Sequence, residues 1–137
     1  SLLNAFGPLN DCLGFNTRTV AMRIPHSDEK NDRVEHRITG ADANPYLVTA
    51  AVLAGILHGL DTKGDPGPPV VGNAYEQTEA RTLFWRDTIN DFMASTFIRA
   101  MFGSEFQHVF GQQKLKEMRS FYTEVTTLEY QWYLRAV

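Results

Sequence analysis

Hydrophobic and polar residues alternate along two short stretches in the first third of the chain. Residues 18–25 read Arg-Thr-Val-Ala-Met-Arg-Ile-Pro and residues 33–38 read Arg-Val-Glu-His-Arg-Ile. A period of two with several β-branched residues predicts a strand in each stretch. The connecting residues 26–32 are polar, so we expect a hairpin whose tip carries Lys30. Residues 1–17 have Gly, Pro, Asn and Asp without a sustained period, which predicts a loop.

An almost wholly apolar run follows at residues 45–57. The pair Asn44-Pro45 predicts a helix start, because Asn accepts a hydrogen bond from an unpaired N–H and Pro at the first helical position loses none. We expect the helix to run to about Leu57, with Gly59 near its end. Since it is apolar nearly all round, it should be buried on most sides, and its length is too short to cross a bilayer.

Apolar residues recur every three or four positions through the second half of the chain. One set, from Trp85 to Met101, predicts an amphipathic helix that ends at Gly103. A second set, from Phe106 to Val125, predicts another helix of the same character, which Ser104 could cap and Gly111 could break.

Two further signals complete the order of elements. Residues 61–73 contain Gly-Asp-Pro-Gly-Pro-Pro, which predicts a rigid loop and excludes a helix or a central strand. Thr126-Thr127-Leu128-Glu129 has the spacing of a capping box and predicts a short last helix. The chain is therefore expected to be α+β and mostly helical, with loop and strands in residues 1–42 and a helical part in residues 43–137.

Composition narrows the class of protein. With 137 residues, 43% of them apolar and 12% aromatic, the chain can bury one core of ordinary size. Its net charge of -3 and pI near 5.7 argue against a protein that binds nucleic acid. The single Cys12 excludes an internal disulfide and favours a reducing compartment, so we expect a cytoplasmic protein with no membrane partner. The chain lacks an initiator Met, and we expect it to be a fragment.

Four arginines surround one glutamate in the predicted hairpin: Arg18, Arg23, Arg33 and Arg37 around Glu35. Strand alternation puts Arg33, Glu35 and Arg37 on one face, which suits anion or metal binding better than a core. The Glu35 carboxylate would be ionised beside the arginines, and the residues alone leave open a structural ion pair or a metal ligand. Arg23 differs in strand parity from Arg18, so it could equally face solvent or a neighbouring subunit.

The segment Arg33-Val34-Glu35-His36-Arg37 is followed by Ala43-Asn44-Pro45-Tyr46-Leu47. Together they resemble the end of the catalytic domain of the glutamine synthetase family, whose members carry R-x-E-x-R and then A-N-P-Y-L at this spacing. The resemblance implies that residues 1–137 are the C-terminal portion of such a domain. Asn44-Pro45 itself is assigned to the scaffold, since capping accounts for it fully. By parity, His36 faces away from Glu35.

The resemblance implies an ATP-dependent ligase that joins the γ-carboxyl of glutamate to ammonia or a primary amine through γ-glutamyl phosphate. Mg²⁺ or Mn²⁺ would be the cofactor, with Glu35 as one metal ligand. Arg18 and Arg37 would be the catalytic residues that hold the substrate glutamate. Four residues would contact ATP: Arg18, Arg23, Lys30 and Arg33. For Arg33, support of a neighbouring ligand remains an alternative.

Two segments, Gly40 to Pro45 and Val125 to Tyr130, look more like the γ-glutamylputrescine synthetase branch than like ammonia-using members. The resemblance also implies a ring-type homo-oligomer. The family's other metal ligands would lie before residue 1, so the fragment alone is expected to be inactive.

The stretch before Arg18 is shorter than the family pattern, and Thr17 stands where the family commonly has Asn. These departures keep a second hypothesis open, a non-catalytic structural relative of the family. A third is a helical module whose arginine patch binds nucleic acid. The acidic pI and the lack of a basic stripe with interleaved aromatic residues count against that third hypothesis.

Overall fold

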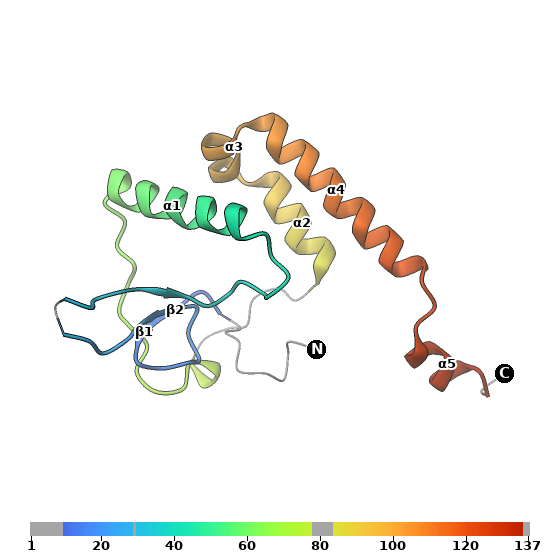
Figure 1. The fold of residues 1–137 in the computed structure, drawn as a ribbon, viewed down its shortest axis with the longest axis horizontal. Coiled ribbons are helices and arrows are strands. Elements are labelled where there is room, and N and C mark those ends of the chain that lie inside the picture. The colour runs from blue at the N-terminus through green and yellow to red at the C-terminus, as the bar shows by residue number, and fades with distance from the viewer. Residues whose placement is uncertain (1–9, 29, 78–83, 136–137) are drawn as a thin grey trace. The chain divides into compact units, whose positions relative to one another are not determined.

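The structure, a computed structural model, describes residues 10–28, 30–77 and 84–135. The chain divides into two compact units, residues 1–81 and 82–137. The first unit holds a small three-stranded sheet and one long helix, and the second holds the remaining α-helices (Figure 1). The prediction of a mostly helical α+β chain is confirmed.

The sheet has the order β1-β2-β3, with β1 at Leu13–Phe15, β2 at Met22–Ile24 and β3 at Glu35–His36. Strands β2 and β3 are antiparallel, which confirms the hairpin. Both strands are shorter than the predicted ranges 18–25 and 33–38. The chain bends before β2, because residues there bond to other loops instead of to a neighbouring strand.

Strand β1 corrects the prediction of a loop over residues 1–17, of which residues 1–9 lie outside the described residues. It pairs in parallel with β2, and Leu13 lies opposite Met22. Only residues 16–21 connect the two strands, whereas parallel neighbours usually need a crossover of about a dozen residues or more. A strand this short, with so short a connection, leaves no periodic signal in the sequence.

Helix α1 spans Pro45–Thr62 and begins as predicted. The Oδ1 atom of Asn44 accepts hydrogen bonds from the backbone N–H groups of the two residues after Pro45, at 3.0 and 3.3 Å. The helix continues past the predicted end near Leu57 and through Gly59. It stops at Lys63, which adopts a left-handed conformation (φ 49°) and donates its N–H back to Gly59 and Leu60. Residues 64–73, which include the Pro-rich stretch, have neither helix nor strand, as predicted. Residues 61–62, which were predicted to be loop, belong to α1.

The prediction that α1 is buried on most sides is wrong for the part of the chain that the structure describes. Ala54 is its one buried residue, while Leu53 is 54% exposed and Leu60 is 70% exposed. A helix that is apolar all round needs cover from several sides. The described residues leave most of its surface uncovered.

The prediction that this helix is too short to cross a bilayer is wrong, because α1 has 18 residues instead of about 13. By length and composition alone it could cross a membrane, with a mean hydropathy of 1.2. Among the described residues it is the one helix that meets this measure. A core helix of a soluble protein passes the same test, so the finding carries little weight by itself.

We expect the 137-residue chain by itself to self-associate, through exposed α1 or through the strand edge between residues 18 and 38, because exposed apolar area and unpaired strand edges drive association. Changing Leu53 and Leu60 together to Gln should reduce the light-scattering mass of concentrated samples. Val71→Gln is the matched control, since Val71 is 82% exposed in a loop. A chain that stays monomeric at high concentration would contradict the prediction.

The single helix predicted from Trp85 to Met101 is instead two helices. Helix α2 spans Trp85–Ala94 and α3 spans Thr96–Phe102. The chain breaks at Ser95, whose Oγ accepts the N–H of Ile98 at 3.2 Å and so caps α3. The predicted end at Gly103 is confirmed, and Gly103 adopts a φ of 87°.

Helix α4 spans Ser104–Thr123 without a break at Gly111. Its N-cap is Gly103, and Ser104 is the first helical residue, so the predicted cap by Ser104 is wrong. Helix α2 approaches α4 at Gly111: a Cβ on Gly111 would lie 2.6 Å from Cγ of Met93. The glycine therefore serves the packing of two helices.

Helix α5 spans Thr127–Tyr133 and begins with the predicted capping box. Glu129 donates its N–H to Oγ1 of Thr126 at 3.2 Å, and Thr126 donates its N–H to the Glu129 carboxylate at 2.7 Å. The hydrogen bond from the Thr126 backbone lowers the pKa of Glu129 below its ordinary value.

Candidate active site

Glu35 lies directly opposite Arg23 in the pairing of β2 with β3. The side chains share one face, and Nη1 of Arg23 lies 2.9 Å from Oε2 of Glu35. The other oxygen, Oε1, is 3.8 Å from Nε of Arg33. Arg23 and Glu35 are part-buried, at 21% and 32% side-chain exposure, while Arg33 is mostly exposed. The closest partner of Glu35 is thus a cross-strand arginine rather than a neighbour along its own strand.

The two oxygens of Glu35 differ in what they can still bind. Oε2 is held by the close contact with Arg23, whose Nε is buried without a hydrogen-bond acceptor. Among the described residues, Oε1 has only the longer contact with an exposed side chain, so its lone pairs can reach a cation. Glu35 therefore fits as one oxygen ligand of a hard divalent ion. The described residues contain no group of three His, Cys, Asp or Glu side chains that could complete such a site.

The other expected cations lie on different segments of the first unit. Arg18 is exposed on the bend before β2, and Lys30 is exposed in the loop after β2. Arg37 follows β3 and is part-buried, and its backbone N–H donates to the carbonyl of Ala21 at 2.9 Å. Arg18 and Lys30 thus flank β2 along the chain, outside the paired strands.

His36 pairs with Met22 in the strand register, on the opposite face from Glu35. It is exposed, and its Nδ1 is hydrogen-bonded to Oγ1 of Thr39 at 3.0 Å. The expectation that His36 turns away from the carboxylate is confirmed. The two hydrogen bonds accepted by Asn44 likewise support its assignment to the scaffold.

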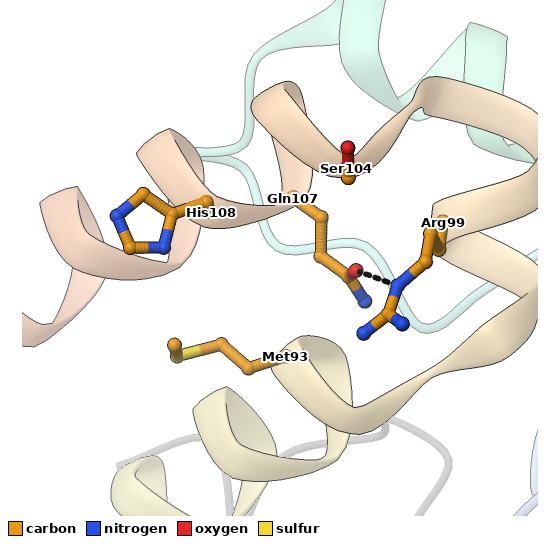
Figure 2. Close-up of a pocket in the computed structure, with 5 residues that line it drawn as sticks. All are labelled: Met93, Arg99, Ser104, Gln107 and His108. Atoms are coloured by element: carbon orange, nitrogen blue, oxygen red, sulfur yellow. Dashed lines mark hydrogen bonds between the residues drawn. The ribbon is translucent and has the colours of Figure 1, made fainter.

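A hollow in the second unit is lined by Met93, Arg99, Ser104, Gln107 and His108 (Figure 2). Gln107 is 4% exposed, and no motif in the sequence singled it out. Its Nε2 donates to the carbonyls of Phe92 and Ser95, both at 2.8 Å, and its Oε1 accepts Nε of Arg99 at 3.2 Å. The side-chain amide is therefore fully used in holding the α2–α3 break to α4, and this hollow is best explained as part of the helix packing.

Gln107→Leu should lower the free energy of unfolding by about 1–3 kcal/mol, because two carbonyls at the α2–α3 break would lose their donor in a buried place. Urea unfolding followed by tryptophan fluorescence would measure the change. Gln113→Leu is the control, since Gln113 is exposed on the same helix and contacts only Glu117 among the described residues. Equal stability of the Gln107→Leu variant and the parent chain would contradict this role.

A family model for the catalytic domain of glutamine synthetase matches residues 3–133 of the chain. The chain belongs to the glutamine synthetase family. The γ-glutamylputrescine synthetase PuuA of Escherichia coli (strain K12) is 42% identical over 129 residues, which are 93% of this chain and 27% of that protein. The glutamate–isopropylamine ligase of Pseudomonas sp is 38% identical over 129 residues, which are 91% of this chain and 28% of that protein.

A glutamine synthetase of Archaeoglobus fulgidus is 30% identical over 139 residues, covering 92% of this chain and 28% of that protein. Among solved structures, ligand-free GmaS superposes with a TM-score of 0.76 and 28% identity, over 97% of this chain and 31% of that chain. The glutamine synthetase fold expected from the sequence is therefore confirmed. The chain spans less than a third of the length of each of these relatives.

Proposed function

We propose that this chain is the C-terminal part of the catalytic domain of an ATP-dependent ligase that joins the γ-carboxyl of glutamate to a primary amine. The observation that carries the proposal is the pairing of Arg23 with Glu35 inside the R-x-E-x-R segment of a glutamine synthetase domain. This pairing holds the Glu35 carboxylate among several arginines, and among the described residues its Oε1 remains available to a cation. Such a group of cations suits a reaction in which negative charge moves between phosphoryl and carboxyl oxygens.

Each charged residue has a role in the proposed reaction. Glu35 holds a divalent cation, which, when bound, offsets charge on the phosphoryl group being transferred. Arg37 and Arg18 hold the carboxylates of glutamate, because a guanidinium group can bind both oxygens of a carboxylate and stays charged out of water. The phosphate oxygens of ATP are bound by Arg18, Arg23, Lys30 and Arg33.

In this scheme Arg23 serves two partners at once. One N–H of its Nη1 is bonded to Glu35, and the guanidinium has further N–H groups that can bind a phosphate oxygen. The same guanidinium then links the metal ligand to the nucleotide. With this geometry, a change at Arg23 would affect both the orientation of Glu35 and the binding of ATP.

The acceptor is proposed to be an amine, because two amine-using relatives are similar to this chain over more than nine tenths of its length. PuuA and the glutamate–isopropylamine ligase share 42% and 38% of residues with it, and their names state amine acceptors. The glutamine synthetase of Archaeoglobus fulgidus shares 30%. By analogy with the family, the full-length protein is proposed to assemble as a ring-type homo-oligomer.

The test is release of phosphate from ATP by the full-length protein with Mg²⁺ and glutamate, comparing ammonia with putrescine, isopropylamine and ethanolamine. One of the amines should support a higher kcat/KM than ammonia. The 137-residue chain alone is the control, and it should release none above background. Preference for ammonia would contradict the amine acceptor, and absence of glutamate-dependent release would favour a non-catalytic relative.

A further inference from the structure

The bend that carries Arg18 is fastened to a distant part of the chain on both sides. Before Arg18, Oγ1 of Thr17 donates to the carbonyl of Gly72 at 3.2 Å. After it, Oγ1 of Thr19 accepts the N–H of Ala74 at 2.9 Å. Both partners lie 55 residues further along the chain. The two threonines therefore hold the backbone on either side of the arginine against one segment of the same unit.

The hydrogen-bond directions in this group can be assigned, because each threonine hydroxyl has a single proton. The two Oγ1 atoms are 2.9 Å apart. The proton of Thr17 goes to Gly72, so the proton between the two hydroxyls belongs to Thr19. The N–H of Thr19 also points to Oγ1 of Thr17, at 3.3 Å. One continuous chain of bonds thus runs from the Ala74 N–H through Thr19 and Thr17 to the Gly72 carbonyl.

Close packing surrounds this chain of hydrogen bonds. A Cβ on Gly14 would lie 2.9 Å from Cγ2 of Thr17, so only glycine leaves room there. Asn10 is 2% exposed, and its side-chain amide donates to the carbonyl of Ala74 at 3.4 Å. Val20 next to Thr19 is fully buried. The backbone around the bend is therefore fixed, and the Arg18 side chain is what extends into solvent.

We propose that Thr17 and Thr19 are positioning residues for Arg18 in the ligase reaction, with Thr19 as the central one. The inference rests on the proposed function, which gives Arg18 the glutamate carboxylate and a phosphate of ATP. An arginine that must bind two anions at once needs a backbone that stays in place, since a small displacement of a binding group removes much of its contribution to substrate binding and to the reaction rate. The hydroxyl of Thr19 holds the backbone beside Arg18 in place by accepting a hydrogen bond from the N–H of Ala74.

The test is steady-state kinetics of the full-length protein with Thr19→Val, which keeps the shape of the side chain and removes its hydroxyl. The KM for glutamate should rise at least about tenfold, while the KM for the amine stays unchanged. Thr19→Ser, which keeps the hydroxyl, should restore the glutamate KM. Thr123→Val is the matched control, because among the described residues Oγ1 of Thr123 bonds only to Ser120 at the end of α4, and it should leave both values unchanged.

A double variant shows whether Thr19 acts through Arg18. Glutamate binding in the presence of an ATP analogue that is not hydrolysed can be measured by calorimetry. In an Arg18→Ala background, Thr19→Val should weaken binding no further, since effects of residues that act as a unit do not add. An equal loss in both backgrounds would overturn the inference.

A missing positioning role and a missing ligase activity would give different kinetic results. If the parent enzyme turns over glutamate and ATP but Thr19→Val leaves the glutamate KM unchanged, the positioning role alone is overturned. If the parent protein shows no glutamate-dependent turnover with any acceptor, the proposed function is overturned, and the positioning role with it.

Discussion

Replacing Glu35 with Gln in the full-length protein is expected to lower glutamate-dependent phosphate release from ATP by more than about 100-fold. Gln keeps the size of the side chain and can still accept a hydrogen bond from Arg23, which lies 2.9 Å from the carboxylate. It removes the negative charge that a divalent cation requires and leaves Arg23 and Arg33 without their counter-charge. The measurement is initial rate against Mg²⁺ concentration.

The control for this variant is Glu117→Gln. Glu117 also forms a close ion pair, 2.7 Å from Lys114, but in helix α4 of the second unit. Its loss should leave turnover unchanged, because an exposed ion pair contributes little. Full activity of Glu35→Gln would show that the Arg23–Glu35 pair is a structural ion pair, which is the alternative that the sequence left open.

The second large effect is expected from Gly111→Leu, which should lower the free energy of unfolding of residues 82–137 by about 3 kcal/mol. Already the first carbon of the new side chain would lie 2.6 Å from Cγ and 3.0 Å from Sδ of Met93, so the Met93 side chain must move out of its place between α2 and α4 or the two helices must separate. The gain in helix propensity, about 1 kcal/mol, offsets only part of this. Urea unfolding followed by the fluorescence of Trp85 and Trp132 reports on this unit.

Gly55→Leu is the matched control on helix α1. A Cβ on Gly55 would meet nothing within 4 Å, so this variant should gain helix propensity without a clash. Circular dichroism of dilute samples would compare the helix content of both variants with that of the parent chain. Equal stability of Gly111→Leu and the parent would show that α2 and α4 do not pack as the structure has them.

Local sequence rules predicted the helix starts correctly at two places. Asn44-Pro45 and the capping box of Thr126 and Glu129 involve bonds between residues at most three positions apart, so the pattern contains the whole interaction. The break at Ser95 has a local signal too, since Ser followed by Thr is a good helix start. However, the spacing of three or four between apolar residues continues across Ser95, and this spacing favoured one long helix.

The candidate site was predictable in part. Strand parity correctly predicted that His36 faces away from Glu35, because parity depends only on neighbours along the chain. It could not show that Arg23 is the partner of Glu35, since that depends on the register between two strands. Strand β1 and the hydrogen bonds of Thr17 and Thr19 depend on contacts with residues distant in the chain. No local sequence pattern predicts such contacts.

The short connection of residues 16–21 between the parallel strands β1 and β2 has a consequence for natural variation and for engineered libraries. Because side chains alternate along a strand, inserting one residue here while β1 keeps its place would turn Met22 toward Glu35 instead of Arg23, and deleting one residue would turn Ile24 toward it. A change of two residues would keep the parity. Length variants tolerated in this connection should therefore differ from the parent by even numbers of residues. Sequencing a library of length variants selected for activity would test this expectation.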